Sequence, residues 1–392
     1  MAVNGNDCGY AITAQNFFSE IGEGDQAPNE QAVSKARQKL HWGAFEYLLR
    51  EANQDDSIED LWRGHRVRIV DGTKLSFPNY RDIRKHFAIP NTKAGPGHYP
   101  QGWMVTLINS TSSQPIAMEL GCGKKSSERD LMLKMLPHFK PNDIALLDRG
   151  LGGGKVYLDF TKAGIHFIHR VKTSGERVAL YVQEFLQSNK SSQITFAPVR
   201  DDDGDEVFLW IRLVKGPKDS EGKRIVFATS LLDKDHYPSS SIRELYRQRW
   251  SIETMYGRIK NVLHIGKFHA RSLNGILQEI YAHLLVISLT ALIDMQASRE
   301  RGLDRTKAVP SFKAATHVIR RHLAVIVGCR KLSRVEANYL AEKMVEEAGR
   351  ILWRKQPGRS FPRVSKQPIN SWNLCKNRKL EAAGRLRRRR AA

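Results

Sequence analysis

The chain of 392 residues, 41% hydrophobic and 8% aromatic, is large enough for two or three domains with real cores and is not a disordered protein. Its 63 Lys and Arg against 41 Asp and Glu give a formal net charge of +22, which favours a polyanionic partner, nucleic acid before an anionic membrane surface. The sequence has no apolar run of about 18 residues and no signal peptide, so we expect an intracellular protein without a membrane partner.

The first 64 residues are predicted to form a polar, partly helical region. The stretch Gln31–Leu49 has helical spacing, with basic residues between its apolar ones. It fits either a small helical unit that contacts DNA or an amphipathic segment leading into the next domain. The sequence does not choose between the two.

A strand is predicted directly before the first candidate carboxylate. Val67 and Ile69 alternate with two arginines ahead of a turn signal, which places Asp71 at the end of the strand. Further strands at 102–108 and 115–120 follow, separated by a polar turn. Three strands in meander order are therefore expected.

The second candidate carboxylate follows a run of apolar residues typical of a strand buried on both faces. A helix is predicted at 126–139 before this run, and the run ends in Asp148 and a glycine-rich turn. A helix at 156–163 and a strand at 166–171 come next. Asp148 thus occupies the carboxyl end of a strand, where open α/β sheets place their ligands.

Residues 174–232 are predicted to be a β-rich insertion. Strand patterns at 193–199, 206–214 and 224–231 are joined by polar, acidic turns. The insertion delays a helix that would otherwise follow the preceding sheet.

That helix is predicted over 241–260, where Ser241 and Glu244 fit a capping box. At about 100° per residue, one roughly 100° arc of the helix lies beside a separate apolar stripe. The arc contains one carboxylate among two cations and two aromatic residues, namely Tyr246, Arg249, Trp250, Glu253 and Lys260. Taken alone, the helix fits either a metal-dependent site acting on nucleic acid or a salt-bridged surface helix.

The carboxyl-terminal part begins with apolar helices expected at 276–295, a core helix, and at 311–327. From Arg350 onward there are fourteen Lys or Arg and one acid, Glu381. This tail is predicted to be largely extended and able to follow a phosphate backbone without reading bases.

Asp71, Asp148 and Glu253 come from separate elements that could converge. Three such carboxylates can hold two divalent cations about 3.5 to 4 Å apart for an in-line displacement at phosphorus. Oxygen ligands favour Mg²⁺ or Mn²⁺. The sequence therefore predicts a two-metal site that acts on phosphodiesters.

The chain resembles the DDE-type cut-and-paste transposases of bacterial insertion sequences, in the group named after insertion sequence four. The signature of that group is Tyr, two residues, Arg, three residues, Glu, six residues, Lys, and it is matched by Tyr246, Arg249, Glu253 and Lys260. Asp71-Gly-Thr and Leu-Asp148-Arg-Gly resemble the contexts of its first two carboxylates.

This resemblance implies an α/β fold with a ribonuclease-H-like core formed by 65–173 and 233–330, interrupted by the insertion at 174–232. It leaves a helical region at 1–64 and a basic region at 331–392. By the same resemblance, Asp71, Asp148 and Glu253 are the metal ligands. Tyr246, Arg249 and Lys260 would contact the terminal phosphates of the transposon end, whereas Trp250 could stack on an unpaired base or fill the core.

The implied function is cut-and-paste DNA transposition. The implied partners are the double-stranded DNA of the transposon ends and of the target, bound by a homodimer. The expected location is the bacterial cytoplasm, with the nucleoid. Two alternatives stay open: a standalone metal-dependent nuclease, and an inactive or domesticated transposase that only binds DNA.

Overall fold

A computed structural model describes residues 9–54, 60–92, 95–122, 126–176, 178–219, 221–261, 263, 265, 268–328 and 332–355. The chain divides into two units, Met1–Trp353 and Arg354–Ala392, and the fold below is that of the first. From residue 356 onward the predicted basic tail lies outside the described residues.

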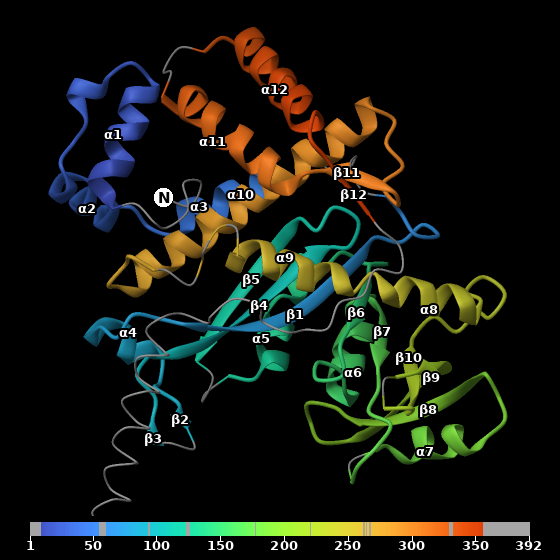
Figure 1. The fold of residues 1–392 in the computed structure, drawn as a ribbon. Helices are drawn as coiled ribbons and strands as arrows, with labels where there is room; N and C mark the ends of the chain where they lie inside the picture. Colours follow the sequence, from blue (N-terminus) through green and yellow to red (C-terminus); the bar gives the residue numbers. More distant parts are fainter. Residues whose placement is uncertain are drawn as a thin grey trace, which may run out of the picture. The chain divides into compact units, whose positions relative to one another are not determined.

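The fold is built on an eight-stranded mixed sheet in the order β5-β4-β1-β6-β7-β10-β9-β8 (Figure 1). Its strands are β1 (Val67–Ser76), β4 (Gln101–Asn109), β5 (Pro115–Cys122), β6 (Ile144–Leu147), β7 (His166–Arg170), β8 (Ser192–Arg200), β9 (Glu206–Lys218) and β10 (Arg224–Thr229). Small separate ladders pair β2 (Asn91–Thr92) with β3 (Gly95–Pro96), and β11 (Ala308–Pro310) with β12 (Leu352–Arg354).

The directions of five neighbouring strands show which fold the central part of the sheet has. β1, β4 and β5 form an antiparallel meander, whereas β6 and β7 run parallel to β1. In a ribonuclease-H-like sheet, an antiparallel meander of three strands is extended, on the side of its first strand, by two strands that run parallel to that first strand. The predicted fold class is confirmed.

The three strands predicted at 174–232 are present and continue the same sheet. β10 pairs antiparallel with β7, and β9 and β8 follow it to the edge. The segment is therefore joined to the core through backbone hydrogen bonds of one continuous sheet.

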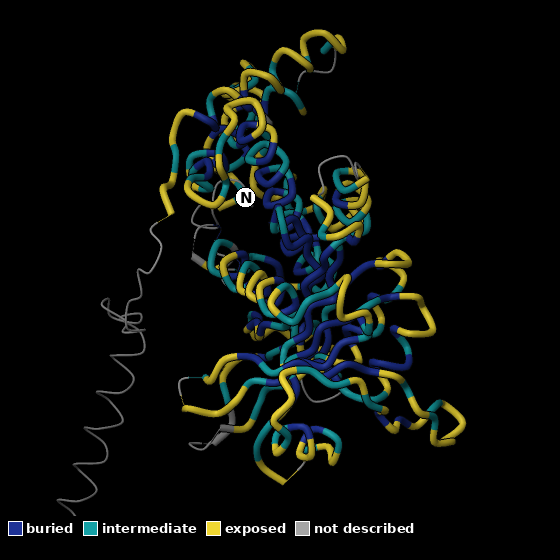
Figure 2. Tube along the Cα trace, turned by 90° about the vertical axis from the view of Figure 1, so that its right-hand side faces the viewer, coloured by how far each residue is buried: buried dark blue, intermediate teal, exposed yellow. Residues whose placement is uncertain are grey.

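Successive side chains of a strand point to opposite faces of the sheet. Because both faces of β1 and β6 are apolar, helices cover both faces of the sheet. On one face, β1 and β6 contribute Ile69 and Leu146 to a cluster with α3, α8, α9 and α10. On the other, Val70 and Leu147 pack against α5, α6 and α7. The helices are α1 (Tyr10–Glu20), α2 (Glu30–Lys39), α3 (Gly43–Ala52), α4 (Arg81–His86), α5 (Glu128–Lys134), α6 (Gly154–Lys162), α7 (Leu180–Gln187), α8 (Ser239–Arg247), α9 (Trp250–Asn261), α10 (Leu273–Glu300), α11 (Phe312–Gly328) and α12 (Arg334–Gly349). Figure 2 shows the buried segments running through the sheet and the helices next to it.

The helix α10 is the central helix of the helical layer. By length and composition it could cross a membrane, but 67% of its apolar window is buried inside the protein. It packs against α3, α11 and α12, and the ring of His283 lies 3.0 Å from the Leu263 carbonyl. It is thus a core helix, as predicted.

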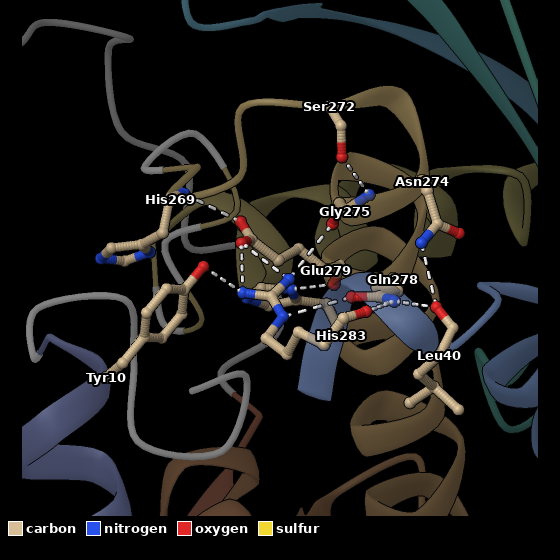
Figure 3. A network of polar contacts seen from close by, with 10 residues as sticks. Tyr10, Leu40, His269, Ser272, Asn274, Gly275, Gln278, Glu279 and His283 are labelled. Carbon is tan, nitrogen blue, oxygen red and sulfur yellow. Dashed lines mark hydrogen bonds and ion pairs between the residues drawn. The ribbon is translucent and has the colours of Figure 1, made fainter. Parts of the chain in front are cut away.

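The amino-terminal helices are anchored to α10. The Asn29 side chain caps α2 by accepting from the Ala32 amide, and α2 ends before the separate helix α3. Arg37 of α2 pairs with buried Glu279 of α10 at 3.2 Å, in the network of Figure 3. Helix α1, which had no clear apolar period, was not predicted.

Three local predictions are wrong. The helix expected over 241–260 breaks into α8 and α9 at Gln248 and Arg249. The capping box is absent, because α8 begins after Pro238 and Ser241 lies inside its first turn. Asp71 is within β1 and not at its end, because β4 continues to pair with β1 as far as Ser76.

Candidate active site

Two neighbouring parallel strands bring the first two predicted carboxylates together. Val70 of β1 is paired with Leu147 of β6, so the next residue on each strand, Asp71 and Asp148, lie side by side. By alternation, both are on the face of Ile69 and Leu146, which is the face that α8 and α9 cover. The ladder between β1 and β6 thus sets the spacing of the two acids.

The third carboxylate is linked to this pair through Arg249. Its guanidinium Nη2 donates to Glu253 Oε1 at 3.1 Å, and Nη1 lies 3.8 Å from Asp71 Oδ2. Arg249 is only 7% exposed. The break between α8 and α9 positions it, because Arg249 forms the turn and Glu253 the first turn of α9.

The carboxylates influence one another electrostatically. Burial raises the pKa of Asp71, and the charges of Asp148 and Glu253 raise it further. The Gly72 amide, which donates to Asp71 Oδ1 at 2.9 Å, and the Arg249 guanidinium lower it. Crowded acids of this kind are stabilised by a cation between them.

Two tyrosines attach α8 and α9 to the strands that carry the acids. The Tyr246 hydroxyl donates to the Leu147 carbonyl at 3.1 Å, and the Tyr256 hydroxyl donates to the Asp71 carbonyl at 2.6 Å. Burial raises the pKa of both phenols. The structure therefore places Tyr246 in the core, and it adds Tyr256, three residues after Glu253, which the sequence analysis missed.

The remaining two predicted DNA contacts lie at opposite ends of α9. Lys260 is exposed in the last turn, and its Nζ donates to Thr73 Oγ1 at 2.5 Å. Although the residue as a whole is exposed, partial burial of its amine lowers the pKa of Lys260. Trp250 begins the helix with 53% of its surface exposed, so the interpretation that it fills the core is wrong. Its ring centroid is 5.7 Å from the Arg249 guanidinium carbon.

A fourth acid near the site was not predicted. Glu128 starts α5, after the capping residue Ser127, on the opposite face of β1 from Asp71. A methyl group at position 72 would meet the Glu128 carboxyl group, so the end of that side chain would have to move aside to admit it. Burial raises the pKa of Glu128, and the charges of Asp71 and Asp148 add to the effect. The glycine that follows Asp71 was the only sign in the sequence that another side chain packs closely against this part of β1.

A model of the family described as the transposase DDE domain matches residues 62–289, which is more than half of the chain. The chain belongs to this DDE transposase family. The matched region includes the whole eight-stranded sheet together with α8, α9 and the carboxylates. The resemblance proposed from the signature is confirmed.

Two curated relatives from Escherichia coli K12 are transposases by name. The chain is 24% identical over 270 residues to the transposase InsG for insertion sequence element IS4, covering 66% of this chain and 59% of InsG. It is 28% identical over 123 residues to the putative transposase InsZ, covering 30% of this chain and 41% of InsZ. The matches thus span less than two thirds of the length of either relative.

A solved piggyBac transposase synaptic complex with hairpin DNA is similar over 78% of this chain and 61% of that chain, with 12% identity and a TM-score of 0.40. A likeness at that level adds nothing to the fold assignment. The assignment stands on the strand order.

The oxygen atoms that the candidate site offers as ligands suit divalent cations. Asp71, Asp148 and Glu253 offer only oxygen ligands, as Mg²⁺ and Mn²⁺ prefer. Within the described ranges, no three His, Cys, Asp or Glu side chains already have the arrangement of a metal site. Arg249 lies between Asp71 and Glu253, and its single charge lies beside these crowded acids.

Proposed function

We propose that this protein is a transposase that binds the terminal inverted repeats of a mobile element and catalyses metal-dependent cleavage and strand transfer of DNA. The observation that carries the proposal is the side-by-side placement of Asp71 and Asp148, with Glu253 joined to Asp71 through Arg249. Membership of the DDE transposase family supports it.

In this proposal Asp71, Asp148 and Glu253 hold two Mg²⁺ or Mn²⁺ ions. Such ions activate water or a 3′-hydroxyl and stabilise the leaving oxygen of the phosphodiester. The protein supplies the fixed spacing of the acids, through the β1–β6 ladder and the tyrosine bonds to Leu147 and Asp71. It also supplies the positive charge of Arg249, which holds Glu253 close to Asp71.

Arg249 and Lys260 are the proposed phosphate contacts. If bound divalent cations balanced the charges of Asp71 and Glu253, the Arg249 guanidinium could turn to a phosphate and bind two of its oxygens. Lys260, exposed at the far end of α9, can neutralise a second phosphate. The exposed indole of Trp250 could stack on an unpaired base.

For Tyr246 we propose a different role from the one the signature suggested. Its ring is buried and its hydroxyl is bound to a backbone carbonyl, so we assign it to positioning the Asp148 strand end. We propose that the DNA partners are the transposon ends and the target, that a homodimer pairs two ends, and that the protein acts in the bacterial cytoplasm.

The reaction products test the proposal. The full chain is incubated with Mg²⁺ and a labelled duplex that ends in the inverted repeat of the element, together with a supercoiled target. A transposase gives free 3′-hydroxyl ends and joined end–target products. A nuclease on the same core gives cut DNA without joined products, and a domesticated DNA-binding protein gives neither.

A further inference from the structure

A large basic cleft lies beside the carboxylates, between α8 and the strands β7, β9 and β10. Its volume is about 1300 Å³, and it is lined by Arg149, Tyr246, Arg247 and Trp250 on the side of the active site. Small-molecule pockets are typically about 300–1,000 Å³. The cleft is thus better suited to a segment of a polymer than to a small anion.

The lining carries a strong excess of positive charge. Eight of its residues are Lys or Arg, and two, Asp219 and Glu221, are acidic. Both acids are already paired with cations of the cleft: Asp219 lies 3.4 Å from Arg170, and Glu221 lies 2.8 Å from Lys223. Six positive charges of the lining therefore lack a carboxylate of the lining to balance them.

The cations of the cleft fall into two groups. Some have structural contacts: Lys215 donates to carbonyls at the end of α7, and Arg243 donates to the Lys215 carbonyl at 3.3 Å. Arg149, Lys190 and Arg247 are exposed, and in the part of the chain that the structure describes no carboxylate pairs with them. These three can bind an external anion without breaking a contact of the fold.

The cleft opens next to the reacting residues. Arg149 directly follows Asp148, and Arg247 and Trp250 flank the turn that holds Arg249. A DNA strand with its scissile phosphate at Asp71 and Asp148 would therefore meet Arg149 first and Arg247 beside it. Lys190, between α7 and β8, belongs to the insertion side of the cleft.

We propose that this cleft binds the phosphodiester backbone of the DNA next to the cleaved phosphate, with Arg149, Lys190 and Arg247 as its phosphate contacts. The proposal rests on the proposed function, because its polyanion is the DNA that the carboxylates cut. It gives the β8–β10 segment a role: these strands extend the sheet to form the second wall of a substrate channel.

The test compares two triple variants that remove the same charges. The cleft variant is Arg149→Gln, Lys190→Gln and Arg247→Gln. The control is Arg84→Gln, Lys343→Gln and Arg334→Gln, which changes exposed residues of α4 and α12 that do not line the cleft. Binding of a fluorescent duplex with the terminal repeat is measured by anisotropy in EDTA over a range of salt concentrations.

The logarithm of the binding constant falls with the logarithm of the salt concentration, and each lost phosphate contact makes this negative slope shallower by about 0.9. We therefore expect the cleft variant to lose about 2 to 3 from the slope and to bind more than about tenfold more weakly at roughly 0.1 M salt. The control is expected to keep the wild-type slope. A variant with Arg149→Lys and Arg247→Lys keeps the charges and should keep the slope, whereas a merely structural role for the arginines would not tolerate both changes.

Equal loss in the cleft variant and the control would overturn the inference, because the effect would then follow net charge alone. An unchanged slope in a folded cleft variant would also overturn it. The proposed function fails separately, if the wild-type chain neither cuts nor joins end-bearing DNA with Mg²⁺.

Discussion

The strongest stability prediction concerns the ion pair that ties α2 to α10. Arg37 Nη2 and Nη1 lie 3.2 and 3.3 Å from Glu279 Oε1, and the side chains are 22% and 4% exposed. The same guanidinium donates to Gln278 Oε1 at 3.2 Å and to the Tyr10 hydroxyl at 2.5 Å. Figure 3 shows the side chains of Tyr10, Gln278 and Glu279 meeting at this point, with the backbone amide of His269 bonded to Glu279.

Replacing Arg37 by Met keeps most of the apolar stem and leaves the carboxylate of Glu279 buried with fewer partners. Removing one partner of a buried ion pair costs about 3–5 kcal/mol. Glu279 Oε2 still accepts from the His269 amide at 3.1 Å, and Arg37 is partly exposed. We therefore expect a loss at the lower limit, about 3 kcal/mol.

Urea unfolding followed by far-UV circular dichroism measures this loss as a fall in the midpoint at constant slope. The matched control, Lys35→Met, changes an exposed cation of the same helix and should stay within about 0.5 kcal/mol of wild type. The double variant Arg37→Met, Glu279→Leu removes both charges and should recover part of the loss, because the His269 amide then lacks its acceptor. A cost below about 1 kcal/mol for Arg37→Met, or no recovery in the double variant, would refute the reasoning.

Three further predictions concern the site. Glu128→Gln should raise the melting temperature near neutral pH; because burial and neighbouring acids raise the pKa of Glu128, the gain should appear as pH rises above the ordinary 4.5 and vanish below it. Gly72→Ala should lower stability by no more than about 1 kcal/mol in urea unfolding, because the Glu128 carboxyl group that its methyl group meets can move aside, and Gly72→Ala with Glu128→Ala should lose less. Tyr246→Phe should cost about 1 kcal/mol and leave end binding unchanged, since its hydroxyl binds the Leu147 carbonyl; tenfold weaker binding would instead indicate a phosphate contact.

The sequence predicted the parts of the site that depend on local patterns. Asp71 and Asp148 follow short apolar runs whose strand character is readable from alternation and burial, and the parallel pairing then brings them together. The strands of the insertion were also readable, because each is a separate β-type run between polar turns. That they extend the sheet past β7 was not readable, since pairing partners are set by tertiary packing.

Long-range contacts account for what was missed. A continuous apolar stripe conceals the break at Gln248 and Arg249, because α8 and α9 both bury that stripe against the same core. Glu128 reaches β1 only through the packing of α5. Arg37 and Glu279 are far apart along the chain, and nothing local identifies them as a pair.

The break between α8 and α9 changes the chemical interpretation of the signature. On one straight helix, Tyr246, Arg249 and Glu253 would share a face and could all meet DNA. In the folded protein Tyr246 holds a strand end, Arg249 joins two carboxylates, and Glu253 begins a new helix beside them. The spacing of the signature residues thus reflects the turn between α8 and α9 as well as the period of a helix.

Cleavage by Glu253→Gln with Mg²⁺ tests the central claim most directly. Gln keeps the size and an acceptor for Arg249 but removes the proposed metal-binding charge, and Glu244→Gln, an exposed acid of α8, is the matched control. We predict that Glu253→Gln binds end-bearing DNA like wild type and cuts it more than about 100-fold more slowly, beyond the roughly 10–100-fold cost of losing an outer-shell partner. The control should cut at the wild-type rate. Undiminished cutting by Glu253→Gln would contradict the assignment of the active site.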